Sequence, residues 1–192
     1  DLHKAIRRQR QMCIRDRYNR PWKCVLRHPD AVTRKLIAQM AKAAAVNNMV
    51  GYCQSHRGTF WTNLADSNFD PAQITVPCEA DCSSGVAAIV KGAGYRLKNE
   101  KLKNVSTACY TGNLRAALKA AGFEVLTDKK YLTSDAYLLE GDILLNDGAH
   151  VATNLTNGAK ASGGGASQTV PINSNVKLET AKGFNKSLAG CL

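Results

Sequence analysis

The order of the periodic segments restricts the fold most, because helical patterns come first and strand patterns come last. Apolar residues recur at helical spacing in three segments, and short β-prone runs occur in three later ones. The helical segments are 31–46, 82–94 and 111–121, and the strand-like segments are 123–126, 141–146 and 150–155. Helices followed by strands are typical of α+β domains. We therefore predict N-terminal helices packed on a small antiparallel β-sheet.

Glycines and one Asn-Gly pair predict where these elements end. Gly92 and Gly94 are expected to stop the second helix and Gly122 the third, since glycine favours the backbone conformation that follows a helix. Asn157-Gly158 is a common two-residue hairpin turn, so a return strand is expected after it.

The positive charge is concentrated near the N-terminus. Residues 1–35 hold eleven Lys and Arg against three Asp, whereas the rest of the chain holds fifteen basic against twelve acidic residues. A block of like charge is typical of a solvated arm, and the segment 12–17 also resembles translated adapter sequence. The predicted divisions are a basic arm, disordered or foreign to the domain, at 1–34, a catalytic domain at 35–168 and a linker-like tail at 169–192.

The sequence gives no support for binding to nucleic acid, for insertion into a membrane or for a metal or other cofactor. The body of the chain lacks a basic motif with interleaved aromatic residues, so specific nucleic-acid binding is not expected. No apolar run approaches the roughly 20 residues of a membrane-spanning helix, and no secretory signal is visible. None of the seven cysteines forms a Cys-x-x-Cys pair and the four histidines are scattered, so we expect no metal and no cofactor.

Cys82 is the strongest candidate for chemistry. It lies at the predicted first turn of a helix, directly after Asp81, where free backbone N–H groups and the helix dipole favour a thiolate. The same N–H groups can hold the oxyanion that forms when sulfur attacks a carbonyl. A small buried cysteine is the alternative, but the polar neighbours Asp81, Ser83 and Ser84 are unusual for a core position.

A thiol hydrolase also needs a base, which is normally a histidine. His150 opens a predicted strand after the turn-like sequence 147–149, where its ring can stand at the edge of the sheet. His3 and His28 lie in the predicted arm, and His56 follows a loop. A histidine with only a structural role is the alternative for His150, and the order of Cys82 on a helix before His150 on a strand favours the catalytic interpretation.

Three short motifs carry a family resemblance. Asp81-Cys82-Ser83-Ser84-Gly85, then Gly141-Asp142-Ile143-Leu144 and Ala149-His150-Val151-Ala152, resemble the NlpC-type papain-like peptidoglycan hydrolases. The Asp-Cys-Ser-Ser form and the upstream Gly51-Tyr52 are similar to phage endolysin catalytic domains. The resemblance spans roughly residues 35–165 and implies a papain-like NlpC-type fold with Cys82 as nucleophile and His150 as base.

The same resemblance implies further site residues. Tyr52, Asp81 and Ser83 correspond to positions that line the substrate pocket, with Gln54 as a weaker candidate. Cys53 stands where relatives often carry an acidic residue. The third catalytic position, twelve residues after the base, is Ser162, although a two-residue turn at 157–158 sets Gly165 opposite His150 instead.

The function that the resemblance implies is hydrolysis of an amide bond in the peptide of bacterial peptidoglycan. The bond is either the muramoyl–L-alanine amide or a peptide bond of the stem or bridge. We expect a monomer that acts at the cell wall and is either made in the cytoplasm for phage-type release or truncated at its N-terminus. A longer chain with a wall-binding domain is one option that the linker-like tail leaves open. The alternatives are an acyltransferase on the same site, a non-catalytic wall-binding module and a nucleic-acid-binding arm.

Overall fold

The computed structural model describes residues 21–161, which form six helices, two 3₁₀ turns and six strands. The helices are α2 (Ala31–Val46), α3 (Thr59–Asp66), α4 (Cys82–Leu97), α5 (Glu100–Lys103), α6 (Leu114–Ala120) and α7 (Lys129–Leu132), and the 3₁₀ turns are η1 (Pro71–Gln73) and η2 (Asp135–Tyr137). The strands are β1 (Cys24–Arg27), β2 (Val50–Tyr52), β3 (Cys78–Ala80), β4 (Glu124–Leu126), β5 (Ile143–Asn146) and β6 (His150–Thr153).

Four strands form one antiparallel sheet in the order β4-β1-β5-β6, and β2 and β3 form a separate parallel pair. The sheet has two apolar faces, because successive side chains of a strand point to opposite sides. One face packs into the main core beneath the helices, with Leu26, Leu145 and Val151 among its residues. The other face carries Val25 and Leu144 in a smaller cluster. The predicted α+β class is confirmed.

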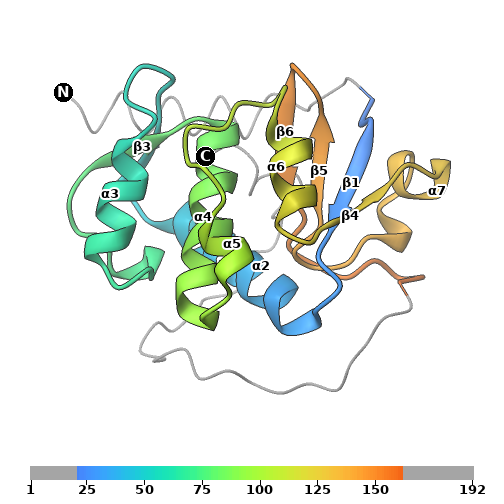
Figure 1. The fold of residues 1–192 in the computed structure, drawn as a ribbon, viewed down its shortest axis with the longest axis horizontal. Coiled ribbons are helices and arrows are strands. Elements are labelled where there is room, and N and C mark those ends of the chain that lie inside the picture. Colours follow the sequence, from blue (N-terminus) through green and yellow to red (C-terminus); the bar gives the residue numbers. More distant parts are fainter. Residues whose placement is uncertain (1–20, 162–192) are drawn as a thin grey trace.

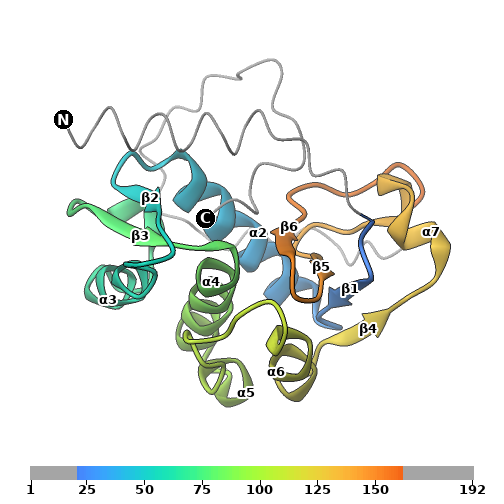
Figure 2. The same cartoon turned by 90° about the horizontal axis from the view of Figure 1, so that it is seen from above.

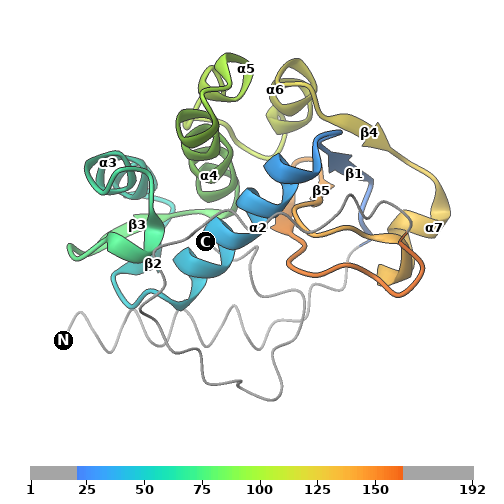
Figure 3. The ribbon, with the colours of Figure 1, turned by 90° about the horizontal axis from the view of Figure 1, so that it is seen from below.

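Helix α4 lies at the centre of the molecule. It packs against α2, α3, α5 and the edge strand β6, and Figure 1 shows it between α3 and the sheet. The views from above and from below show α2 on the side of α4 that is turned away from the viewer in Figure 1, and α7 at the end of the molecule away from α3 (Figures 2 and 3). Residues 82–90 of α4 are all buried, so the first turn of this helix is held on several sides.

Strand β1 lies where the sequence predicted a basic arm through residue 34. Val25 and Leu26 are fully buried, and the strand pairs with β4 on one side and β5 on the other. The helix that follows also begins at Ala31, capped by the Asp30 carboxylate. The start of this helix was predicted, but β1 was missed because a four-residue strand that follows a lysine and ends in an arginine carries little pattern of its own. Residues 21–34 are therefore part of the folded domain.

Helix α4 continues through the glycines that were expected to end it. Its C-cap is Lys98, at φ 54°, rather than Gly92 or Gly94. These glycines allow close packing instead: a Cβ on Gly94 would lie 2.6 Å from the backbone nitrogen of Lys103 in α5. Gly122, at φ +98°, does follow the end of α6, as predicted.

The Asn157-Gly158 pair does not form the predicted hairpin within the described residues. The Asn157 side chain accepts a hydrogen bond from the Glu140 N–H, and the Gly158 N–H donates to the Leu138 carbonyl. The segment therefore packs back on the chain that leads into β5, and β6 has no second strand partner within residues 21–161. The Asn-Gly pair indicates a turn, but its hydrogen bonds to Glu140 and Leu138 depend on distant parts of the chain and cannot be predicted from the pair itself.

The two glycines of α4 give a matched test of the close approach to α5. Gly94→Ala should lower the free energy of unfolding by about 2 kcal/mol or more, since the new methyl group meets backbone atoms. Gly92→Ala should change it by less than about 1 kcal/mol, because there the nearest atoms are the ends of the Met40 and Leu64 side chains and helix propensity improves. Urea unfolding followed by circular dichroism measures both, and equal midpoints for the two variants would contradict this account.

Candidate active site

The first turn of α4 is fixed by a reciprocal cap around Asp81. The Asp81 carboxylate accepts hydrogen bonds from the Ser84 N–H at 2.7 Å and the Ser83 hydroxyl at 3.0 Å, and the Ser84 hydroxyl accepts from the Asp81 N–H at 2.9 Å. Such a capping box satisfies N–H groups that a helix start leaves without partners. Cys82 is consequently the first residue of the helix, as the sequence predicted.

The Cys82 sulfur lies at the open edge of β6. The backbone N–H of Val151 donates toward it, and the N–H groups of Ser83 and Cys82 itself lie close to it. Alternate residues of an edge strand direct their N–H groups away from the neighbouring strand, so Val151 is available for this contact. The helix start and the edge strand therefore meet at the predicted nucleophile, one residue along the chain from His150.

The His150 side chain lies on the outer face of the sheet. It shares that face with Ala152, two residues further along β6, and its ring stacks on Trp22 at 6.1 Å between centroids. Asn146 is the direct cross-strand partner of His150, and its amide nitrogen donates to the Pro21 carbonyl at 2.9 Å. The segment before β1 thus positions the Trp22 indole against the predicted base. The sequence analysis gave Trp22 no such role, because it assigned residues 1–34 to a basic arm.

Burial sets the protonation of both groups in the same direction, toward their neutral forms. It raises the pKa of the Cys82 thiol, which is 8% exposed, and the Val151 N–H opposes this only in part. Burial also lowers the pKa of the His150 imidazole from its ordinary 6.5. A neutral thiol and a neutral imidazole are therefore the resting pair at neutral pH.

Arg57 is a residue of this region that sequence reasoning missed. Its guanidinium forms an ion pair with Asp81 at 2.9 Å, donates to the Ser83 hydroxyl at 3.1 Å and donates to the Cys109 carbonyl. It thereby joins the loop after β2 to the start of α4. Its position in a polar loop, between His56 and Gly58, carries no motif that identifies it.

The remaining predicted residues fall in different places. Tyr52 ends β2 and pairs with Ala80, so it lies next to the start of α4, while Gln54 is exposed in the loop that follows. Asp81 and Ser83 are buried at 8% and 3% exposure and are occupied by the cap and by Arg57. Ser162 lies outside the described residues.

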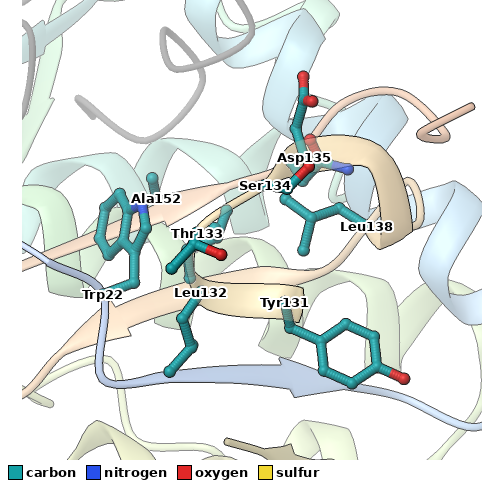
Figure 4. A pocket seen from close by; sticks show the side chains of 10 residues that line it. Trp22, Tyr131, Leu132, Thr133, Ser134, Asp135, Leu138 and Ala152 are labelled. Carbon is teal, nitrogen blue, oxygen red and sulfur yellow. The ribbon is translucent and has the colours of Figure 1, made fainter. Parts of the chain in front are cut away.

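A cavity of about 230 Å³ opens on the outer face of the sheet, beside the Trp22 that stacks on His150. Figure 4 shows Trp22 near Ala152 at one end, with Leu138 and Asp135 toward the other. The lining is mainly apolar and aromatic, with a few polar groups, which is the usual character of a ligand site. This cavity lies on the base's side of β6, whereas α4 and Cys82 lie on the other.

A comparison with protein families bears on what this arrangement does. The model of the endolysin-like domain matches residues 7–161, most of the chain. The chain belongs to this family. No curated protein and no solved structure matches the chain.

Membership of the endolysin-like domain family indicates a hydrolytic enzyme that acts on peptidoglycan, with a phage-type role in cell-wall lysis. The match begins at residue 7, well before the predicted domain start at 35. Within residues 21–161 of this endolysin-like domain, every helix is too short or too polar to cross a lipid bilayer.

The cap of α4 in the endolysin-like domain can be tested through its stability. Asp81→Ala should lower the free energy of unfolding by about 1–2 kcal/mol, because the Ser84 N–H loses its acceptor and Arg57 loses its ion pair. Asp81→Asn keeps a side-chain acceptor and should cost clearly less. Urea unfolding compares the two, and an alanine variant as stable as wild type would show that the cap does not hold this turn.

Proposed function

We propose that this endolysin-like domain cleaves an amide bond in the peptide part of peptidoglycan, with Cys82 as nucleophile and His150 as general base. One observation carries the proposal: the Cys82 sulfur, at a helix N-terminus, meets the N–H of the residue next to His150. Family membership supports the substrate. The finer assignment to the NlpC type rests on the motifs around Cys82, Asp142 and His150.

The proposed reaction begins from the neutral pair. As the Cys82 sulfur attacks the amide carbonyl, the thiol proton passes to His150, and the carbonyl oxygen takes up negative charge. The N–H groups of the first turn of α4 stabilise that oxyanion. The imidazolium then gives its proton to the departing amine, the C–N bond breaks, and a thioester remains. Water, deprotonated by His150, hydrolyses the thioester and restores the thiol.

The substrate side of the proposal involves two kinds of residue. Tyr52 lies next to the start of α4 and Gln54 is exposed in the loop that follows β2, and both remain candidates for direct substrate contact. Asp81 and Ser83 act by shaping the turn, because their polar atoms are engaged with Arg57 and with each other. Ser162 is kept as the proposed third catalytic residue. The proposed bond is either the muramoyl–L-alanine amide or a peptide bond of the stem.

A non-catalytic wall-binding module is the second candidate, and one observation favours it. Cys82 is only 8% exposed, as expected for a structural thiol. Alkylation separates the two candidates: iodoacetamide should label Cys82 and block lysis if the thiol is the nucleophile. Binding to walls without loss of turbidity, together with an unlabelled Cys82, would favour the binding module.

Replacement of the nucleophile is the direct test. Cys82→Ala should reduce the rate of peptidoglycan clearing by about 10³-fold or more, since the covalent step is lost. Cys24→Ala is the matched control: it removes a buried thiol from β1 on the same core and should leave activity near wild type. Turbidity loss of purified walls measures both variants after circular dichroism has verified folding. Wild-type clearing by Cys82→Ala would exclude the mechanism.

The pH dependence tests the state of the base. The imidazole must be neutral to accept a proton, and burial lowers the pKa of His150 below 6.5. The acid limb of the kcat/KM profile should therefore fall below pH 6.5, with activity retained in mildly acidic buffer. Cleavage of a soluble muropeptide, followed by chromatography across the pH range, gives this profile. An acid limb well above 6.5 would contradict a neutral buried imidazole.

A further inference from the structure

Three potential metal ligands that have no part in the proposed reaction meet beside the β2–β3 pair. Cys53 follows β2 directly, His56 lies three residues further on, and Glu79 is the middle residue of β3. The Cys53 sulfur lies 3.4 Å from His56 Nδ1, and the same nitrogen lies 3.3 Å from Glu79 Oε2. All three ligand atoms lie within 4.8 Å of one another.

The two distances from His56 Nδ1 fit a tetrahedral metal ion. Zinc binds sulfur at about 2.3 Å, imidazole nitrogen at about 2.0–2.1 Å and carboxylate oxygen at about 2.0–2.2 Å. At tetrahedral angles, those bonds set sulfur and nitrogen about 3.5 Å apart and nitrogen and oxygen about 3.4 Å apart. The distances from His56 to Cys53 and to Glu79 differ from these values by only about 0.1 Å, so an ion needs little rearrangement of that nitrogen's neighbours.

The backbone holds the ligand-bearing segments together. The Cys53 N–H donates to the Ala80 carbonyl at 3.1 Å, extending the β2–β3 pairing past Tyr52. The Thr59 hydroxyl donates to the His56 carbonyl at 3.0 Å and accepts from the Glu79 N–H at 2.8 Å. One side chain thus connects the loop that carries the imidazole to the strand that carries the carboxylate, and the cluster is organised by contacts outside itself.

We propose that Cys53, His56 and Glu79 form a Zn²⁺ site with a fourth position open to water. A thiolate and an imidazole select zinc over calcium or magnesium, which prefer all-oxygen ligands. The two negative charges of thiolate and carboxylate balance the ion. The His56 side chain is 69% exposed, which leaves a path for the ion and for the water that completes the tetrahedron.

Such an ion would connect the β2 loop to the chain that enters α4, because Glu79 precedes Cys82 by three residues. It would thereby stabilise the start of α4. The sequence analysis expected no metal because the chain has no Cys-x-x-Cys pair. The cluster combines Cys53-x-x-His56 with Glu79, which only the pairing of β2 with β3 brings close. The inference is independent of the catalytic role of Cys82.

Cobalt substitution in the full chain carrying Cys82→Ala tests the site, so that no metal binds at the proposed nucleophile. Addition of Co²⁺ to the reduced protein should give one equivalent of a species with thiolate-to-metal charge-transfer absorption and intense tetrahedral d–d bands. Zn²⁺ should displace it and raise the Tm. Cys53→Ser in the same background should abolish the charge-transfer band, and Cys109→Ala should retain it.

Glu79→Gln provides a second variant that keeps the thiolate. It should preserve the charge-transfer band but weaken Co²⁺ binding at least about 10-fold, as expected when a ligand loses its charge. The absence of tetrahedral bands in the Cys82→Ala protein would overturn the proposal. Bands that persist in Cys53→Ser, or affinity unchanged in Glu79→Gln, would also overturn it. Because wall lysis is not measured, the result stands apart from the test of the catalytic mechanism.

Discussion

The contact between the start of α4 and the open edge of β6 is the interaction on which the site depends. A thiol at a helix N-terminus is common, and so is a histidine at the start of a strand. Here the outward N–H of Val151 donates toward the Cys82 sulfur, which brings the start of α4 to the residue next to His150. Packing on both sides holds this contact, with the Asp81 cap and Arg57 on the helix and the β5 ladder behind β6.

The same burial that orders this contact limits the reactivity of the resting thiol. A helix N-terminus favours a thiolate, but desolvation at 8% exposure outweighs it and raises the pKa of Cys82. Burial lowers the pKa of His150 as well, so a preformed thiolate–imidazolium pair is disfavoured on both partners. In the proposed mechanism the N–H groups of α4 therefore act on the oxyanion, whose charge develops only during the reaction.

The sequence predicted those features that have a local cause. Helical periodicity and a cap at Asp81 placed Cys82 on the first turn of α4, and the α+β class followed from the order of segments. Features set by contacts between distant segments were missed. Strand β1 is too short to carry a pattern. Gly94 suggests a helix end in the sequence, whereas in the structure it allows α5 to pack closely on α4. Arg57 forms its ion pair with Asp81 from a loop that has no recognisable motif.

The two sides of β6 carry different parts of the proposed chemistry. Val151 points into the core with Cys82, whereas His150 and Ala152 point to the outer face, where Trp22 and the cavity lie. A nucleophile and a base on opposite sides of one strand can act together only around its open edge. Within residues 21–161 no further strand pairs with β6; Val151, Ala152 and Thr153 are buried, and only His150 at the start of the strand is partly exposed. In the proposed mechanism the scissile amide therefore meets the sulfur and the imidazole at the His150 end of this edge.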